Sequence, residues 1–472
     1  MIIKIDKKKC IPLSRQIYSA IKDFILSGTV SSGEKLPSSR TLSKHLGVSR
    51  NTVLEAYNQL IAEGYLEGKH GSGTLVAKGI TKHNRPAYIR QLKEISAPFN
   101  TKEETIDFRS GVPDFSLFPQ KEWVNLYKKI CGNLPKTVFR YCNFGGVWEL
   151  RESISQYLFR TRGIECHPKN IMIISGATQG LALLSRLLFK KYKKALVEEP
   201  VHPSILKIIT SEGISVEGIE ADDKGINTSL LKTNSDASFI YTTPSHQYPL
   251  GSVLPIQRRL SLIQFVSEKD CYVIESDYGN GSTFRFEGAP ISSLYELNPE
   301  KVIYLSSFSK ILSPALRLAF MILPDTLIKE YEYLKMNADV HSEVLSQYVL
   351  AEYINSGQLE KHTAKINKIY NQKRKNLISE LHNHLPGEFE IKGQTAGLHV
   401  LACFHNIIFN SELINRIASS GVTVYPVENF TFQNHGRHRN EIIMGYAHLS
   451  PLEITLGVKI MSHIINDYCN PK

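Results

Sequence analysis

The sequence lacks the features of a secreted, metal-bound or membrane-spanning protein. Its seven cysteines lie far apart and include no Cys-x-x-Cys pair, so neither a disulfide framework nor a metal site is predicted. No apolar run approaches the roughly 18 residues that span a bilayer. The first residues, Met1 to Lys9, lack the apolar stretch of a signal peptide. We therefore expect a cytoplasmic protein without membrane contact.

Size and charge suggest more than one domain and a polyanionic partner. The chain has 472 residues, too many for one ordinary domain, and its 42% hydrophobic and 21% charged residues are typical of a globular protein. The formal net charge of +11 favours nucleic acid as a partner, although a generally basic surface would give the same value.

The first part of the chain, residues 11–77, contains three helical patterns followed by a hairpin pattern. Ser38 is placed to cap the second helix, Gly47 to make a turn, and Ser49 to cap the third helix. Two helices joined by a short turn with glycine form a helix-turn-helix. The short apolar runs around glycines in residues 65–76 predict a β-hairpin wing.

The N-terminal turn of the third helix carries side chains suited to DNA. Arg50 matches guanine, Asn51 matches adenine, and Thr52 matches a thymine methyl or a phosphate. A small packing domain with polar caps is the alternative explanation. The predicted DNA contacts are Ser38, Ser39, Arg40, Ser49, Arg50, Asn51, Thr52, Tyr57, Lys69 and Gly71.

Three motifs in this module, at 33–40, 46–53 and 64–66, closely resemble the winged helix-turn-helix of GntR-type bacterial repressors. The resemblance extends over residues 11–76. It implies that residues 1–77 form a DNA-binding domain and that operator DNA is a partner.

Residues 78–104 show no periodic pattern of apolar residues and are predicted to form a basic linker. From residue 105 to 472, short apolar runs alternate with amphipathic helical stretches, which predicts an α/β domain with a mostly parallel sheet between helices. Strands are expected near 171–174, 195–197, 238–241, 272–274, 302–305 and 318–322. Helices are expected near 148–162, 178–190, 203–212, 256–268, 325–338, 340–355 and 358–383.

Polar motifs follow several of the predicted strands, where open α/β sheets bind ligands. In the turn at 175–180, the Ala177 amide and the Thr178 hydroxyl suit an anion at a helix N-terminus. Three further strand ends contribute His202, His246, Asp277 and Tyr278. Each motif alone has an ordinary explanation as a helix cap or surface residue.

Lys310 gives these motifs a common purpose. Its amine can form a Schiff base, while Ser307, Ser309 and Arg317 can hold a phosphate, and pyridoxal 5'-phosphate (PLP) carries both an aldehyde and a phosphate. Partial burial and the neighbouring Arg317 are expected to lower the pKa of Lys310. An acid such as Asp277 would pair with the pyridine nitrogen.

The order of motifs at 108–119, 141–151, 175–180, 246–251, 277–278 and 307–310 resembles the fold-type I aminotransferases. With the GntR-type head, the whole chain resembles the MocR/GabR subfamily of transcriptional regulators. The resemblance implies a homodimer in which Lys310 forms the internal aldimine. It further implies that His202 stacks on the ring and that the phosphate is held by Thr178, Ser307, Ser309 and Arg317.

Three positions depart from the aminotransferase pattern. Tyr248 stands where aminotransferases usually have asparagine, and Ser276 precedes Asp277 where the subfamily often has two acids. We favour Asp277 over Ser276 as the partner of the ring nitrogen. The late arginine that holds a substrate carboxylate is absent, since its natural position is Ile443. Its loss removes hydrogen bonds worth roughly 1.5–3 kcal/mol each.

These departures favour sensing over catalysis. The leading hypothesis is a dimeric regulator that senses PLP through Lys310 and controls vitamin B6 metabolism. A regulator that senses an amino acid or amine by external aldimine formation is the alternative, and a true aminotransferase ranks third.

Overall fold

The computed structural model describes the chain in ten stretches. They are residues 3–7, 11–69, 73–80, 105–189, 192–231, 236–277, 283–289, 291–385, 388–433 and 435–469. The chain divides into two compact units, residues 1–100 and 101–472. Most of the predicted linker, residues 78–104, lies outside the described residues. None of the helices in these stretches is long and apolar enough to cross a bilayer.

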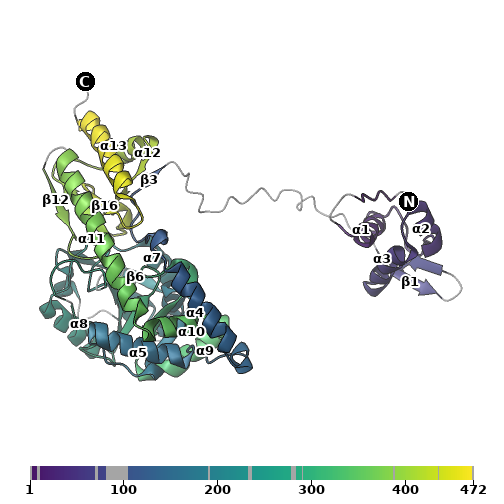
Figure 1. Cartoon of the computed structure of the whole chain (residues 1–472), viewed down its shortest axis with the longest axis horizontal. Helices are drawn as coiled ribbons and strands as arrows, with labels where there is room; N and C mark the ends of the chain where they lie inside the picture. Colours follow the sequence, from purple (N-terminus) through teal and green to yellow (C-terminus); the bar gives the residue numbers. More distant parts are fainter. Residues whose placement is uncertain are drawn as a thin grey trace. The chain divides into compact units, whose positions relative to one another are not determined.

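The smaller unit is a three-helix domain with a two-stranded hairpin (Figure 1). Its elements are α1 (Leu13–Leu26), α2 (Ser39–Leu46), α3 (Arg50–Ala62), β1 (Leu66–Lys69) and β2 (Gly73–Val76). Ser38 Oγ accepts the Thr41 amide at 3.1 Å and Ser49 Oγ accepts the Thr52 amide at 3.1 Å, so each serine caps its helix. Gly47 ends α2 in the left-handed region at φ +61°. The expected helix-turn-helix and wing are both present.

The larger unit is built on an eight-stranded sheet. In spatial order the strands are β4 (Ile171–Ile174), β11 (Ala319–Ile322), β10 (Val302–Ser307), β9 (Tyr272–Ser276), β8 (Phe239–Thr242), β5 (Lys194–Glu199), β6 (Ser215–Asp222) and β7 (Gly225–Ile226). The five strands from β10 to β6 run parallel, and the pairs at both edges are antiparallel. This confirms the α/β class with a mostly parallel sheet.

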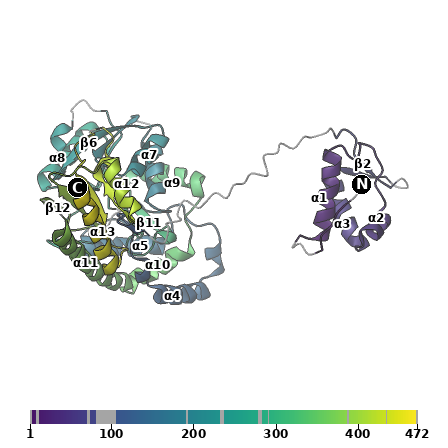
Figure 2. The ribbon, with the colours of Figure 1, turned by 90° about the horizontal axis from the view of Figure 1, so that it is seen from above.

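Helices cover both faces of this sheet because its strands are buried on both sides. One face packs against α6 (Ala177–Leu188), α7 (Pro203–Ser211) and α9 (Asp325–Asp339). The other packs against α5 (Trp148–Arg162), α8 (Ile256–Lys269), α10 (Leu345–Asn355) and α11 (Gln358–His384). Along β10, Ile303 and Leu305 belong to the first layer, whereas Val302 and Tyr304 belong to the second. Helix α10 packs against both α5 and α4 (Gln120–Asn133), as Figure 2 shows.

A second, smaller sheet lies toward the C-terminus. It contains β12 (Phe389–Lys392), β13 (His399–Phe404), β16 (Glu441–Gly445) and β15 (Tyr425–Pro426). Around it lie α12 (Ser411–Ser419), α13 (Pro451–Cys469) and a short pairing of β3 (Ile106–Asp107) with β14 (Val422–Thr423). β3 therefore brings the first described residues of the larger unit to its C-terminal part. The helices α11 and α13 pack together (Figure 1).

Candidate functional site

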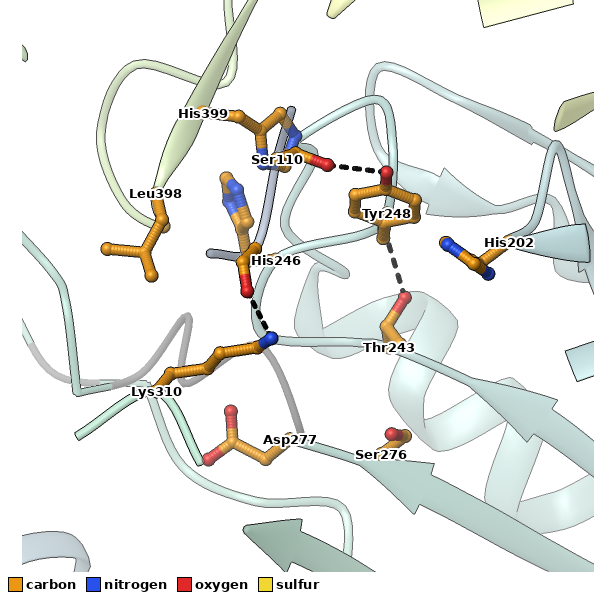
Figure 3. A pocket seen from close by; sticks show the side chains of 12 residues that line it. Ser110, His202, Thr243, His246, Tyr248, Ser276, Asp277, Lys310, Leu398 and His399 are labelled. Carbon is orange, nitrogen blue, oxygen red and sulfur yellow. Dashed lines mark hydrogen bonds between the residues drawn. The ribbon is translucent and has the colours of Figure 1, made fainter. Parts of the chain in front are cut away.

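A pocket of about 120 Å³ lies at the carboxyl ends of the parallel strands, where open α/β sheets place ligands. It brings together four of the predicted site residues, His202, His246, Asp277 and Lys310 (Figure 3). The other lining residues are Ser110, Gly111, Thr243, Tyr248, Ser276, Gly397, Leu398 and His399.

Lys310 follows β10 by three residues and sends its amine into this pocket (Figure 3). The side chain as a whole is partly buried, but its Nζ is enclosed and donates to the Gly111 carbonyl. Burial lowers the pKa of Lys310 from 10.5 to about 8. The expected contribution of Arg317 to this shift is absent, since burial alone accounts for it. An amine with this pKa is partly neutral near pH 7, as a nucleophile requires.

Ser276 ends β9, Asp277 directly follows it, and both line the pocket. Asp277 is 5% exposed, and its Oδ2 accepts from Arg162 Nη1 at 2.9 Å and from the Tyr304 hydroxyl at 2.8 Å. Ser276 Oγ is buried, and within the described part of the chain it contacts no polar group except the Tyr241 hydroxyl. The neighbouring prediction, Tyr278, lies outside the described residues.

The predicted phosphate-binding groups come from two turns. Ala177 and Thr178 line a cavity that also includes His202 and Ser276, which extends the site from the pocket toward the N-terminus of α6. In the second turn, the hydroxyls of Ser307 and Ser309 are 2.8 Å apart.

Arg317 connects these two turns. Its Nη2 donates to the Ser175 carbonyl at 2.8 Å, and the guanidinium rests against Gly176. A Cβ atom on Gly176 would displace the Arg317 guanidinium, and the backbone at φ +96° favours glycine.

Three histidine rings surround the pocket. His202 caps α7, because its Nδ1 accepts a hydrogen bond from the Ser204 amide at 3.2 Å. The pKa of His202 is lowered mainly by burial and further by the positive charge of Lys310. The rings of His246 and His399 lie 5.2 Å apart. Burial lowers the pKa of His399 to about 4, and burial with the nearby His399 and Arg285 lowers that of His246 to about 3, so both rings are neutral at pH 7.

The turn after β8 holds Tyr248 against the segment that follows β3. The Tyr248 hydroxyl and Ser110 Oγ are 2.6 Å apart, and burial raises the pKa of Tyr248 to about 12. Glu198 secures this turn from β5, because its buried carboxyl accepts from Thr242 Oγ1 at 2.5 Å and Thr243 Oγ1 at 2.7 Å.

Several residues in or next to the pocket were not singled out from the sequence. Ser110 and Gly111 lie within the 108–119 motif, whereas His399, Arg162 and Tyr304 carried no local signal. Ile443, the position without a clamping arginine, is fully buried among Leu401, Cys403 and Val427. Arg437 pairs instead with Glu220.

In the smaller unit, seven of the ten predicted DNA contacts lie at the N-termini of α2 and α3. Arg40, Arg50 and Asn51 are exposed, and Arg50 Nε donates to Ser39 Oγ at 3.4 Å. Tyr57 needs correction, because its ring is 3% exposed in the core and its hydroxyl donates to the Pro37 carbonyl at 2.7 Å. Gly71 and the side chain of Lys69 lie outside the described part of the chain.

Comparisons with known proteins match both units. Residues 13–76 match the family of bacterial regulatory proteins called gntR, and residues 103–439 match aminotransferase class I and II. The chain is 28% identical to the probable rhizopine catabolism regulatory protein MocR of Rhizobium meliloti, over 97% of this chain and 94% of that protein. It is 29% identical to the pyridoxine biosynthesis transcriptional regulator PdxR of Corynebacterium glutamicum, over 88% of each.

Among solved structures, kynurenine aminotransferase of Pyrococcus horikoshii superposes with a TM-score of 0.72 at 25% identity, over 82% of this chain and 96% of that one. The aminotransferases of this fold depend on PLP. The two matched domains and their relatives together show that the chain is a MocR-type transcriptional regulator of the GntR family, with a PLP-dependent aminotransferase class I and II domain.

Proposed function

We propose that this regulator binds operator DNA as a dimer and senses PLP through a Schiff base on Lys310, and that it controls vitamin B6 metabolism. One observation carries the proposal. The Lys310 amine lies in a pocket beside Asp277, and burial lowers its pKa to about 8. The name of the relative PdxR, a regulator of pyridoxine biosynthesis, supports the link to vitamin B6.

The residues present fit PLP. Arg317 over Gly176, with the hydroxyls of Thr178, Ser307 and Ser309, would hold the phosphate. The face of His202 and the carboxylate of Asp277 would orient the ring. When bound, PLP supplies an aldehyde that reacts with a neutral amine, which is the form that the enclosure of Lys310 favours.

PLP itself is favoured over an amino acid because the described residues include no arginine at the natural position of the carboxylate clamp. None of the described residues that line the pocket is an arginine. Ile443, in the natural position of the clamp, is buried among apolar side chains. Arg109 is instead engaged with Asp107, with 2.6 Å between Nη2 and Oδ2.

An amino compound as effector remains the second candidate, and one observation favours it. His246 lines the pocket, and within the described part of the chain its buried ring nitrogens have no polar contact beyond a weak one with the Gly251 backbone. A polar group of a ligand would satisfy one of them. This candidate predicts that an amine or amino acid shifts the visible absorption of the PLP-loaded protein. A broad panel of amines that produces no shift would exclude it.

Exposed apolar side chains near the start of the larger unit support the dimer. Phe139 is 64% exposed and Tyr141 is 86% exposed, and Phe115 and Trp148 are also exposed. Large exposed apolar side chains are candidates for an interaction surface. Sedimentation should therefore show a dimer for the full chain and a monomer for the double variant Phe139→Asp/Tyr141→Asp. A wild-type monomer would contradict the proposed dimer.

The central test combines PLP with DNA binding. DNA is first selected by the full-length protein from a random duplex library, and its affinity is then measured with and without PLP at fixed salt. PLP should change the affinity of the wild-type protein but not that of Lys310→Ala. Lys129→Ala, which removes an exposed lysine paired with Glu352, is the matched control. A PLP effect that survives in Lys310→Ala refutes sensing through this amine.

A further inference from the structure

Asp277 lies between two cavities. The pocket that contains Lys310 is on one side. A second cavity, of about 260 Å³, is lined by Asp277 together with Arg162 and Tyr304. Neither Arg162 nor Tyr304 lines the Lys310 pocket. The carboxylate therefore borders the pocket where a cofactor ring would lie on one side and the cavity that contains Arg162 and Tyr304 on the other.

Three elements converge on this carboxylate. Arg162 is the last residue of α5, Tyr304 lies in the middle of β10, and Asp277 directly follows β9. Both donors contact the same oxygen, Asp277 Oδ2, at 2.9 Å from Arg162 Nη1 and 2.8 Å from the tyrosine hydroxyl. The arginine and aspartate side chains are only 8% and 5% exposed, so solvent screens this ion pair weakly.

The charge on Arg162 is matched mainly by Asp277. The other nearby acid, Glu275, is fully buried and accepts from Ser293 Oγ and from the Tyr295 amide. Burial raises the pKa of Glu275 and so favours its neutral form. For Arg162, burial works to lower the pKa, but Tyr304, Asp277 and Glu275 outweigh it and raise the pKa.

We propose that Arg162 is a positioning residue for Asp277, which fixes the carboxylate and balances its charge. This inference rests on the proposed function, because it assumes that Asp277 faces the ring nitrogen of PLP. The nitrogen then meets an acid whose charge is already compensated, so a proton on the ring is held less strongly than by an uncompensated acid. A weakly protonated ring is a poor electron sink, which suits retention of PLP as a signal better than turnover.

The test compares PLP with its carbocyclic analogue, 1-deazapyridoxal 5'-phosphate, in which carbon replaces the ring nitrogen. The ratio of their dissociation constants on the full-length protein reports the contact at the nitrogen alone. Arg162→Met should increase the preference for PLP on the order of tenfold, because Tyr304 still holds Oδ2 while the counter-charge is lost. Arg162→Lys, which keeps the charge, should retain the wild-type ratio.

Two further variants complete the design. Arg160 lies two residues before Arg162 in α5, is exposed and pairs with Glu360. Arg160→Met should therefore leave the ratio of dissociation constants unchanged. Asp277→Asn should abolish the preference for PLP. If Arg162→Met does not fold, as judged by circular dichroism, Arg162→Gln replaces it with the same expected increase.

The outcomes separate the two levels of the proposal. No PLP binding by the wild-type protein refutes the proposed function. A preference that is insensitive to Asp277→Asn refutes the placement of the ring nitrogen. If Asp277→Asn abolishes the preference but uncharged variants at position 162 leave it unchanged or lower it, the role of Arg162 is wrong and the proposed function stands.

Discussion

Replacement of Lys310 by methionine should stabilise the PLP-free protein near neutral pH. The pKa of the lysine falls from 10.5 in the unfolded chain to about 8 in the folded one. The difference of about 2.5 units corresponds to about 3 kcal/mol of unfavourable free energy in the folded state. Loss of the hydrogen bond to the Gly111 carbonyl offsets about 1 kcal/mol. Lys310→Met should therefore raise the free energy of unfolding by about 2 kcal/mol at pH 7.

The sign of the pH dependence follows from the lowered pKa. Below pH 8 both folded and unfolded chains carry the protonated amine, so the full penalty applies. As pH rises from 8 to 10.5, the folded protein releases its proton before the unfolded chain does, and the penalty disappears. The advantage of Lys310→Met should thus shrink with rising pH and be absent by about pH 10.5.

Tryptophan fluorescence during urea denaturation measures this difference in unfolding free energy for the larger unit, which contains Lys310. Both tryptophans of the chain, Trp123 and Trp148, belong to the larger unit. Lys129→Met, at an exposed position, is the control for removal of a lysine as such. Equal stability of wild type and Lys310→Met at pH 7, or a difference that does not depend on pH, would refute the cost assigned to the buried amine.

Three other substitutions test separate parts of the molecule. Gly176→Ala should weaken PLP binding at least about tenfold in a fluorescence titration, since the new methyl would displace Arg317 and the backbone has φ +96°; unchanged affinity would contradict the phosphate site. Arg50→Ala should weaken DNA binding by about 1–3 kcal/mol in an anisotropy assay without loss of helicity, because its side chain is exposed. Tyr57→Phe should lower the stability of the smaller unit by about 1 kcal/mol in calorimetry, through loss of the bond to Pro37.

The sequence predicted elements whose signals are local. The helix predicted at 148–162 matches α5, Trp148–Arg162, and the strand at 171–174 matches β4, because each keeps a clear apolar period between turn residues. The helix predicted at 340–355 begins only at Leu345. Its start is set by Glu343, whose carboxylate accepts the Leu345 amide at 2.6 Å, while Val340 has φ +60°.

Contacts between segments far apart in the chain could not be predicted, because no local sequence pattern indicates them. Arg162 reaches Asp277 across 115 positions, and nothing in the helical pattern of α5 distinguishes this arginine from the exposed Arg160. His399 enters the pocket only because β13 pairs with β16 in the second sheet. Tyr57 was misassigned for the converse reason, since the sequence pattern of α3 is equally compatible with a tyrosine in the core and with one on the surface.

The apolar surroundings of Ile443 disfavour an arginine at the natural position of the carboxylate clamp. On β16 it pairs with Leu401 of β13 and with Tyr425 of β15, and it packs against Val427 and Phe430. An arginine introduced there would have to bury a charge in this apolar cluster, at a cost of several kcal/mol without a paired acid. Introduction of a clamping arginine at this position would therefore require coordinated changes on at least two strands. The apolar packing of the second sheet thus supports the proposal that PLP itself, and not an amino acid, is the ligand of this pocket.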